Sequence, residues 1–86
     1  MEIVLDNHTK ERAIERGVSE DEIIDTIKNG NDFQAKTNRK GKYKIFQFNN
    51  IRNKVYYKQK RVEVIYLIEK SKIITITVYA FYGKWE

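Results

Sequence analysis

The sequence lacks cysteine and proline, and its 86 residues include only one histidine. Without cysteine the chain cannot form disulfides, use a thiolate as a nucleophile, or hold zinc or iron–sulfur clusters through sulfur. A single histidine leaves carboxylates as the other ligands for a transition metal, and these are not spaced along the chain as a ligand set would be. The sequence therefore predicts a domain without a metal or other cofactor.

Long apolar stretches are also missing from the chain. No stretch approaches the roughly 18 residues of a membrane-spanning helix, and no signal peptide precedes the first charged residue, Glu2. We therefore expect a cytoplasmic protein without a membrane partner. The length fits one domain, which buries only roughly 60–65% of the surface that its unfolded chain exposes, so the predicted core is small.

Acidic residues are absent from the middle of the chain. Residues 1–32 hold nine acids and four bases, whereas residues 33–61 hold ten bases and no acid. Such segregation is typical of a surface that faces phosphates or an acidic protein partner, although a solvated face of a lysine-rich protein is the alternative. Beside Lys58, the bases predicted to bind RNA are Lys36, Arg39, Lys40, Lys42, Lys44, Arg52, Lys54, Lys60 and Arg61.

The first predicted helix covers residues 7–16. Asp6 or Asn7 can cap it through a side-chain oxygen, and Gly17 follows as a residue that commonly ends helices. Because residues four positions apart share one face of a helix, this helix carries a basic stripe. The stripe consists of His8, Arg12 and Arg16.

The second predicted helix covers residues 20–29 and has the strongest local signal in the chain. Ser19 and Glu22 form a capping box, in which each side chain satisfies the backbone N–H of the other residue. Ile23 and Ile27 belong to its apolar face, and Gly30 follows its last turn. These signals predict both ends of the helix.

The hydrophobic period then changes to two, which is typical of strands. The predicted strands cover residues 42–48, 52–59, 62–68 and 73–81. Asn49-Asn50 is the expected turn after the first strand, and the polar run 69–72 joins the last two. The order predicts an α+β domain in which two N-terminal helices pack on a four-stranded antiparallel sheet.

The chain from His8 to Tyr79 resembles a known family. The pattern His8-x-x-x-Arg12-x-x-x-Arg16-Gly17-Val18-Ser19-x-x-Glu22-Ile23 and the threonine-rich strand 74–79 are similar to domain of unknown function 4258. This resemblance implies a relation to RelE/ParE-like toxins, small metal-independent ribonuclease folds with helices packed on an antiparallel sheet. It further implies RNA, often on the ribosome, as the target, and an acidic antitoxin protein as an inhibitory partner.

Metal-independent RNA cleavage needs a proton acceptor for the 2′-hydroxyl, positive charge at the phosphate, and a proton donor for the leaving oxygen. His8 is the natural acid or base, because histidine is the residue type whose unperturbed pKa lies near neutrality, and Arg12 can hold the phosphate. The sheet would add Lys58 or Arg61 for charge, Thr75 or Thr77 for orientation, and Tyr79 as a hydroxyl donor. The predicted catalytic set is His8, Arg12, Lys58, Thr77 and Tyr79.

Each of these residues also has a structural interpretation. His8 can be a capping or packing residue, Arg12 can pair with Glu15 or Glu63, and threonine and tyrosine are common in strands. Three functions therefore stay open at this point. The first is a toxin acting as a metal-independent endoribonuclease, the second is a non-catalytic RNA- or ribosome-binding module, and the third is a basic protein whose positive face binds an acidic antitoxin.

Overall fold

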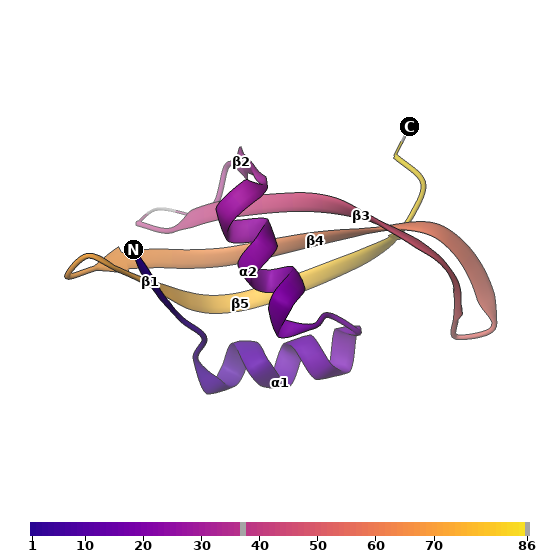
Figure 1. The fold of residues 1–86 in the computed structure, drawn as a ribbon, viewed down its shortest axis with the longest axis horizontal. Coiled ribbons are helices and arrows are strands. Elements are labelled where there is room, and N and C mark those ends of the chain that lie inside the picture. The colour runs from indigo at the N-terminus through magenta and orange to yellow at the C-terminus, as the bar shows by residue number, and fades with distance from the viewer. Residues whose placement is uncertain (37, 86) are drawn as a thin grey trace.

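The computed structural model describes residues 1–36 and 38–85. In chain order its elements are β1 (Glu2–Val4), α1 (Asn7–Arg16), α2 (Glu20–Asn29), β2 (Asn31–Phe33), β3 (Lys40–Arg52), β4 (Val55–Glu69) and β5 (Lys72–Gly83). Within these residues the strands form one five-stranded sheet in the order β1-β5-β4-β3-β2 (Figure 1). β1 lies parallel to β5, and the other neighbours are antiparallel.

The predicted α+β class is confirmed, but the predicted four-stranded antiparallel sheet is wrong. The described chain forms a mixed sheet with two further strands, β1 and β2, at its outer edges. Each of them has only three residues. A hydrophobic period cannot be recognised over so short a segment, so the sequence carries no signal for either strand.

The predicted strands 52–59 and 62–68 are also wrong as separate elements, because β4 runs without a break over fifteen residues. The middle of β4 holds Lys60 and Arg61, which pair with both neighbouring strands. Two adjacent charged residues suggest a loop between strands. In the fold, however, Lys60 pairs with Glu22 and Arg61 with Glu63, so both can lie within a strand.

The turn between β3 and β4 lies at Asn53-Lys54, where both residues have positive φ (53° and 69°). Positive φ at both central positions is what a two-residue hairpin turn requires. The predicted turn at Asn49-Asn50 is wrong: this pair lies inside β3, where the register shifts between Gln47 and Asn50. Asparagine tolerates positive φ in a bulge as in a turn, so the local sequence does not distinguish the two sites.

Both helices begin and end where the sequence predicts. The Thr9 N–H donates to Asp6 Oδ1 at 2.8 Å at the start of α1, and Gly17 ends that helix with a φ of 75°. At α2 the Ser19 and Glu22 side chains each accept from the other residue's backbone N–H, at 3.1 and 2.9 Å. Within residues 1–36 and 38–85, neither helix has the length and apolar character needed to cross a bilayer.

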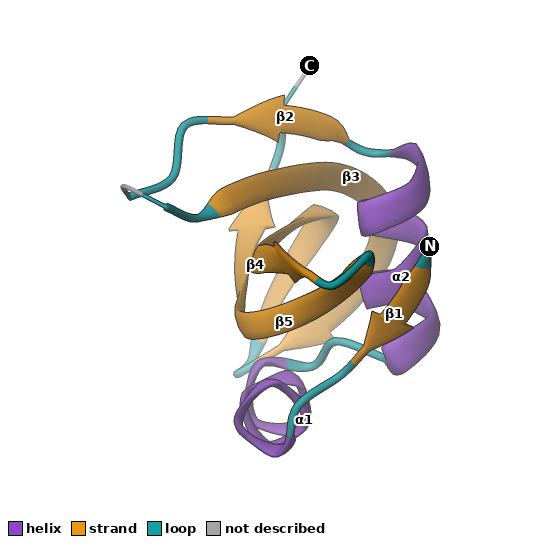
Figure 2. Ribbon diagram, turned by 90° about the vertical axis from the view of Figure 1, so that its left-hand side faces the viewer, coloured by secondary structure: helices purple, strands orange, loops and turns teal. Residues whose placement is uncertain are grey.

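The hydrophobic core lies between the helices and one side of the sheet. It contains Ala13, Val18, Ile23, Ile27, Val62, Val64, Tyr66 and Val78. α1 packs against β5, and α2 packs against β4 and β3. Figure 2 shows α2 on one side of the curved sheet, while no described helix covers the opposite side.

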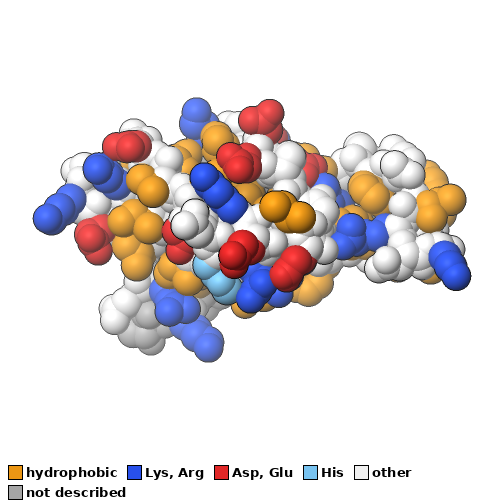
Figure 3. Space-filling view, turned by 90° about the horizontal axis from the view of Figure 1, so that it is seen from below, with side chains coloured by type: hydrophobic (Ala, Val, Ile, Leu, Met, Phe, Trp, Pro, Cys, Tyr) orange, Lys and Arg blue, Asp and Glu red, His pale blue; other side chains and the backbone are white. Residues whose placement is uncertain are grey.

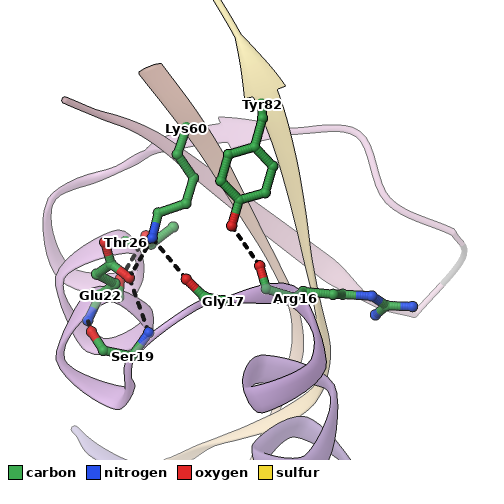
Figure 4. Close-up of polar contacts among 7 residues, drawn as sticks. All are labelled: Arg16, Gly17, Ser19, Glu22, Thr26, Lys60 and Tyr82. Atoms are coloured by element: carbon green, nitrogen blue, oxygen red, sulfur yellow. Dashed lines mark hydrogen bonds and ion pairs between the residues drawn. The ribbon is translucent and has the colours of Figure 1, made fainter. Parts of the chain in front are cut away.

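Side chains from three strands bind the last carbonyl groups of α1 and its cap. Arg52 Nη2 donates to Glu15 O at 2.9 Å, Tyr82 Oη to Arg16 O at 2.6 Å, and Lys60 Nζ to Gly17 O at 2.9 Å. The last two bonds are drawn in Figure 4. Because a helix C-terminus carries partial negative charge, the two cations stabilise it. Burial also raises the pKa of the Tyr82 hydroxyl, which stays protonated as a donor. These bonds hold α1 beside β5.

Candidate functional site

The side of the sheet away from α2 is crossed by three rows of side chains from β3, β4 and β5, which we call the open face. The rows are Gly41, Ile65 and Thr77, then Tyr43, Glu63 and Tyr79, then Ile45, Arg61 and Phe81. Neighbouring residues along each strand point toward the helices, because side chains alternate between the two sides of a sheet. The fold therefore brings the predicted residues Thr77 and Tyr79 together on the open face.

A pocket of about 260 Å³ lies on the open face. It is lined by Phe33, Gln34, Ala35, Lys36, Arg39, Glu63, Ile65, Thr77 and Tyr79. The first five residues come from β2 and from residues 34–36 and 39, which follow it in the chain. Because segments far apart in sequence line this pocket, no single stretch of the chain indicates it.

An arginine and a glutamate form an ion pair next to the pocket. The Nε atom of Arg61 lies 2.7 Å from Glu63 Oε2, and the Arg61 guanidinium lies 3.8 Å from the centre of the Tyr43 ring. The two charged side chains are 24% and 18% exposed, so water screens the pair only in part. Glu63, which the sequence suggested only as a partner of Arg12, is thus a pocket residue held in place by Arg61.

The side chain of Arg16 connects α1 to the open face. Its Nη1 atom donates to the carbonyl oxygen of Val78 at 2.7 Å, and its guanidinium lies 5.0 Å from the centre of the Tyr79 ring. Tyr79 in turn stacks on Phe81, with ring centres 6.5 Å apart. The third residue of the basic stripe, which the predicted catalytic set omitted, is therefore the one that reaches the open face.

His8 and Arg12, the other residues of the stripe, lie at the surface of α1. His8 is exposed and forms no hydrogen bond or ion pair with a residue that the structure describes. Arg12 Nη1 binds both carboxylate oxygens of Glu15, at 2.9 and 2.7 Å. The structural interpretation of Arg12 as a partner of Glu15 is thus confirmed, and neither residue makes a described polar contact with Thr77 or Tyr79.

The acid-free segment of the sequence meets acidic side chains in space. Lys42 Nζ lies 2.9 Å from Asp32 Oδ1, Lys44 Nζ 2.7 Å from Asp25 Oδ2, and Lys60 Nζ 2.9 Å from Glu22 Oε1. The hydrogen bond from Lys44 lowers the pKa of Asp25, and the bond to Asp32 raises the pKa of Lys42. Much of the charge segregation is therefore internal pairing, and Lys60, with a side chain only 6% exposed, presents no ammonium group to RNA.

Five of the bases in residues 33–61 have no polar or ring partner for their side chains among the described residues. They are Lys36, Arg39, Lys40, Lys54 and Lys58. The first two line the open-face pocket. Lys54 and Lys58 lie at the end of the β3–β4 hairpin that extends beyond the helices in Figure 1. Five residues of extended strand separate Lys58 from Glu63 by about 16 Å, so Lys58 lies outside the pocket.

Positive and negative side chains are mixed on the surface seen from below in Figure 3. Among residues 1–36 and 38–85, no three histidine, aspartate or glutamate side chains are grouped as a metal site. Among the described bases of the acid-free segment 33–61, those with unpaired side chains therefore lie at the pocket, at the neighbouring Lys40 and at the hairpin end. We call the segment 51–58 the hairpin tip.

Residues 5–80 match the model of a family described as "Domain of unknown function (DUF4258)". The matched range contains α1, α2 and β2 to β4 in full, together with the part of β5 that lines the pocket. No curated protein and no solved structure matches the chain. The relation to RelE/ParE-like toxins stays a prediction.

Proposed function

The chain belongs to the DUF4258 family, and from the chemistry of its open face we propose that it is a metal-independent endoribonuclease, the toxin of a toxin–antitoxin-like pair. The observation that carries this proposal is the pocket, where hydroxyl groups, aromatic rings and cations from separate segments converge. Single-stranded RNA suits such a site, because aromatic rings stack on unpaired bases and cations bind phosphates.

The proposed reaction is an internal transfer within the RNA chain. The 2′-hydroxyl loses its proton, its oxygen attacks the neighbouring phosphorus, and the bond from phosphorus to the 5′-oxygen breaks as that oxygen takes up a proton. The products are a 2′,3′-cyclic phosphate end and a 5′-hydroxyl end. The protein has to supply a proton acceptor, a proton donor and positive charge at the phosphate.

The position of α1 supports a contribution from its basic stripe. The Asp6 N–H donates to Thr75 Oγ1 at 3.2 Å at one end of the helix, and Arg16 binds the Val78 carbonyl at the other. α1 therefore runs beside β5, and a stripe that ends over Tyr79 follows the border of the open face.

One proton transfer is assigned to a residue of α1 and the other to a residue of the open face. His8 accepts the 2′-hydroxyl proton, because its side chain is exposed and imidazole is the commonest general base in enzymes. The Tyr79 hydroxyl donates to the leaving oxygen, and Thr77 orients the ribose. Arg12 and Arg16 hold the phosphate through the guanidinium nitrogens that their protein partners leave accessible.

The hairpin tip extends the proposed RNA path and offers a place for an antitoxin. Its lysines, Lys54 and Lys58, bind phosphates away from the cleaved bond, so Lys58 serves binding rather than catalysis in this proposal. Ile51, Val55 and Tyr56 are 64%, 48% and 60% exposed there. An acidic antitoxin segment would bury these apolar side chains and pair with the lysines, and so exclude RNA. The substrate, including mRNA on the ribosome, is cytoplasmic.

A non-catalytic RNA-binding module is the second candidate, and two observations favour it. Arg12 already binds Glu15, and Arg61 already binds Glu63, so part of the positive charge near the open face is compensated. His8 has no described partner that would orient its ring for proton transfer. Both features are compatible with RNA binding through the open face, but both are unfavourable for catalysis.

Cleavage of RNA in EDTA tests the proposal, with and without ribosomes, and with the fold of each variant checked by circular dichroism. We expect 5′-hydroxyl products from the wild type and a loss of roughly 10²–10⁴-fold in rate for His8→Ala. Tyr79→Phe should slow the same step, and Lys28→Ala, on the exposed side of α2, is the control. Salt-sensitive binding without cleavage in either condition would instead establish the binding module.

A further inference from the structure

The open-face pocket contains a carboxylate that the proposed cleavage does not use. Glu63 Oε2 binds Arg61, and the other carboxylate oxygen has no partner among residues 1–36 and 38–85. A carboxylate repels the phosphates of RNA, so its presence among the cations of the pocket requires a different ligand group. The N–H groups on the edge of a nucleobase are suitable donors to it.

The geometry of Glu63 is set before any ligand binds. Arg61 lies against the Tyr43 ring at 3.8 Å and holds one oxygen of the carboxylate at 2.7 Å. This pair fixes the direction of the carboxylate and offsets part of its charge. A site held by its neighbours in this way loses little side-chain entropy when a base binds.

The size and walls of the pocket suit a single base. Its volume of about 260 Å³ is below the roughly 300–1,000 Å³ of pockets for drug-sized ligands. Phe33, Ile65 and Tyr79 provide apolar and aromatic surface, against which the flat face of a base can pack. Lys36 and Arg39 add positive charge from the loop.

The combination of donors and acceptors selects one base. Guanine presents two adjacent donors, N1–H and the N2 amino group, which match a carboxylate, and its O6 and N7 are the acceptors that Arg and Lys bind most often. The single N–H of uracil lies between two acceptors, which a carboxylate repels. Adenine and cytosine each present an amino group beside an acceptor ring nitrogen, so they satisfy the carboxylate only in part.

We propose that the open-face pocket is a guanine-recognition site, in which Glu63 binds the N1–H and N2 amino edge and Lys36 or Arg39 binds O6 and N7. This inference rests on the proposed RNA function, because it names the base that the enzyme holds at its site. It makes Glu63 a specificity-determining residue and predicts that cleavage occurs next to guanosine.

Oligoribonucleotides that differ at one position test the proposal by fluorescence anisotropy with the full chain. Each carries guanosine, adenosine, cytidine, uridine or inosine within an otherwise uridine sequence. We expect guanosine to bind about tenfold or more tightly than the other standard bases. Inosine lacks the N2 amino group, so it should lose part of this preference.

Glu63→Gln should abolish the preference, because an amide presents a single acceptor oxygen and adds a competing donor. Glu69→Gln makes the same charge change at the exposed end of β4 and should keep the preference. If Glu63→Gln does not fold, the comparison of guanosine with inosine on the wild type decides the question alone.

The outcomes separate this inference from the function on which it rests. Equal, salt-sensitive binding of all five oligonucleotides would overturn the guanine site and leave the RNA proposal standing. Preferential binding of guanosine monophosphate over adenosine monophosphate, with no RNA bound or cut, would support the guanine site and overturn the endoribonuclease. Retained guanosine preference in a folded Glu63→Gln variant would also overturn the assignment.

Discussion

On the helix-covered side of the sheet, three lysines of the acid-free segment pair with carboxylates of α2 and β2, and two of them also lie over phenylalanine rings. On the open face the guanidinium groups of Arg16 and Arg61 lie over tyrosine rings, and Arg61 pairs with Glu63. Lys60 is the most buried of these lysines and binds Glu22 and the end of α1. Arg61, the next residue along β4, points to the other side and lies over Tyr43. Adjacent cations in one strand thus have different surroundings because successive side chains face opposite sides.

The comparison separates cations that stabilise the fold from cations that can meet a ligand. The Lys60 side chain is only 6% exposed, and a positive charge so shielded from water must have hydrogen-bonding partners of its own. A guanidinium on an aromatic ring keeps its outer nitrogens accessible and can bind a phosphate or a base as well. The number of basic residues in the sequence therefore overstates the cationic surface of this protein. Which of these residues can meet a ligand depends on the side of the sheet that they face.

The largest effect is expected from the core under the helices. Ile23 is fully buried, so Ile23→Ala should lower the free energy of unfolding by about 2–5 kcal/mol. In a domain with a total stability of about 5 kcal/mol, this loss approaches unfolding. Urea denaturation followed by circular dichroism measures it, with Ile14→Ala, at an 83% exposed position, as the control. Similar losses in both variants would contradict the described core.

Lys60→Met and Lys58→Met compare a buried and an exposed cation in one strand. Lys60→Met leaves the Gly17 carbonyl without a donor and Glu22 with the Ser19 N–H as donor but without its ion-pair partner, so we expect a loss of about 1–3 kcal/mol. Lys58→Met should leave stability unchanged but weaken RNA binding. It should also reduce the slope of log affinity against log salt concentration by about one. Urea titration and RNA affinity at several salt concentrations measure the two effects. Equal stability of both variants would contradict the distinction between the buried and the exposed cation.

The loss of stability in Arg61→Ala should lie between those in Lys60→Met and Lys58→Met. It removes a cation–π contact and a partly screened ion pair, together expected to contribute about 1 kcal/mol. The same variant should bind RNA less tightly, because Glu63 loses the neighbour that orients it. Thermal unfolding and fluorescence anisotropy measure the two effects. A stability loss as large as that of Lys60→Met would place Arg61 among the structural cations.

The smallest effect is expected from the partly exposed pair of Asp25 and Lys44, and it depends on pH. The hydrogen bond from Lys44 lowers the pKa of Asp25 below its ordinary value of 3.8. A lowered pKa in the folded state contributes stability that is present above pH 3.8 and is lost as the pH falls through the folded value. Thermal unfolding between neutral and acidic pH should therefore show a shallower acid loss for Asp25→Asn than for the wild type.

Lys44→Gln is the matching control for this titration. It removes the larger cause of the lowered pKa of Asp25 and keeps the hydrogen bond from Asn29, so its acid dependence should lie between those of the wild type and Asp25→Asn. A wild-type acid dependence in Lys44→Gln would show that the lowered pKa has a different cause from the hydrogen bond described here.

Part of the candidate site could be predicted from the alternation of side chains along the last strand. Thr77 and Tyr79 are two residues apart, so they share one side of β5 whatever the pairing. Glu63 could not be placed beside Tyr79 from the sequence, because the β4–β5 register shifts between Ile65 and Tyr66. Arg16 was visible in the basic stripe, but its contact with Tyr79 depends on where α1 packs.

The sequence by itself determined the two helices, their caps and the change to strands, because these depend on contacts between residues only a few positions apart. The tertiary structure decided the number of strands, the pairing of the acid-rich helix with the acid-free segment, and the pocket. These depend on strand register and on packing between segments such as residues 33–39 and 77–79. Interactions between distant segments leave no periodic pattern in the local sequence, and so only the assembled fold reveals them.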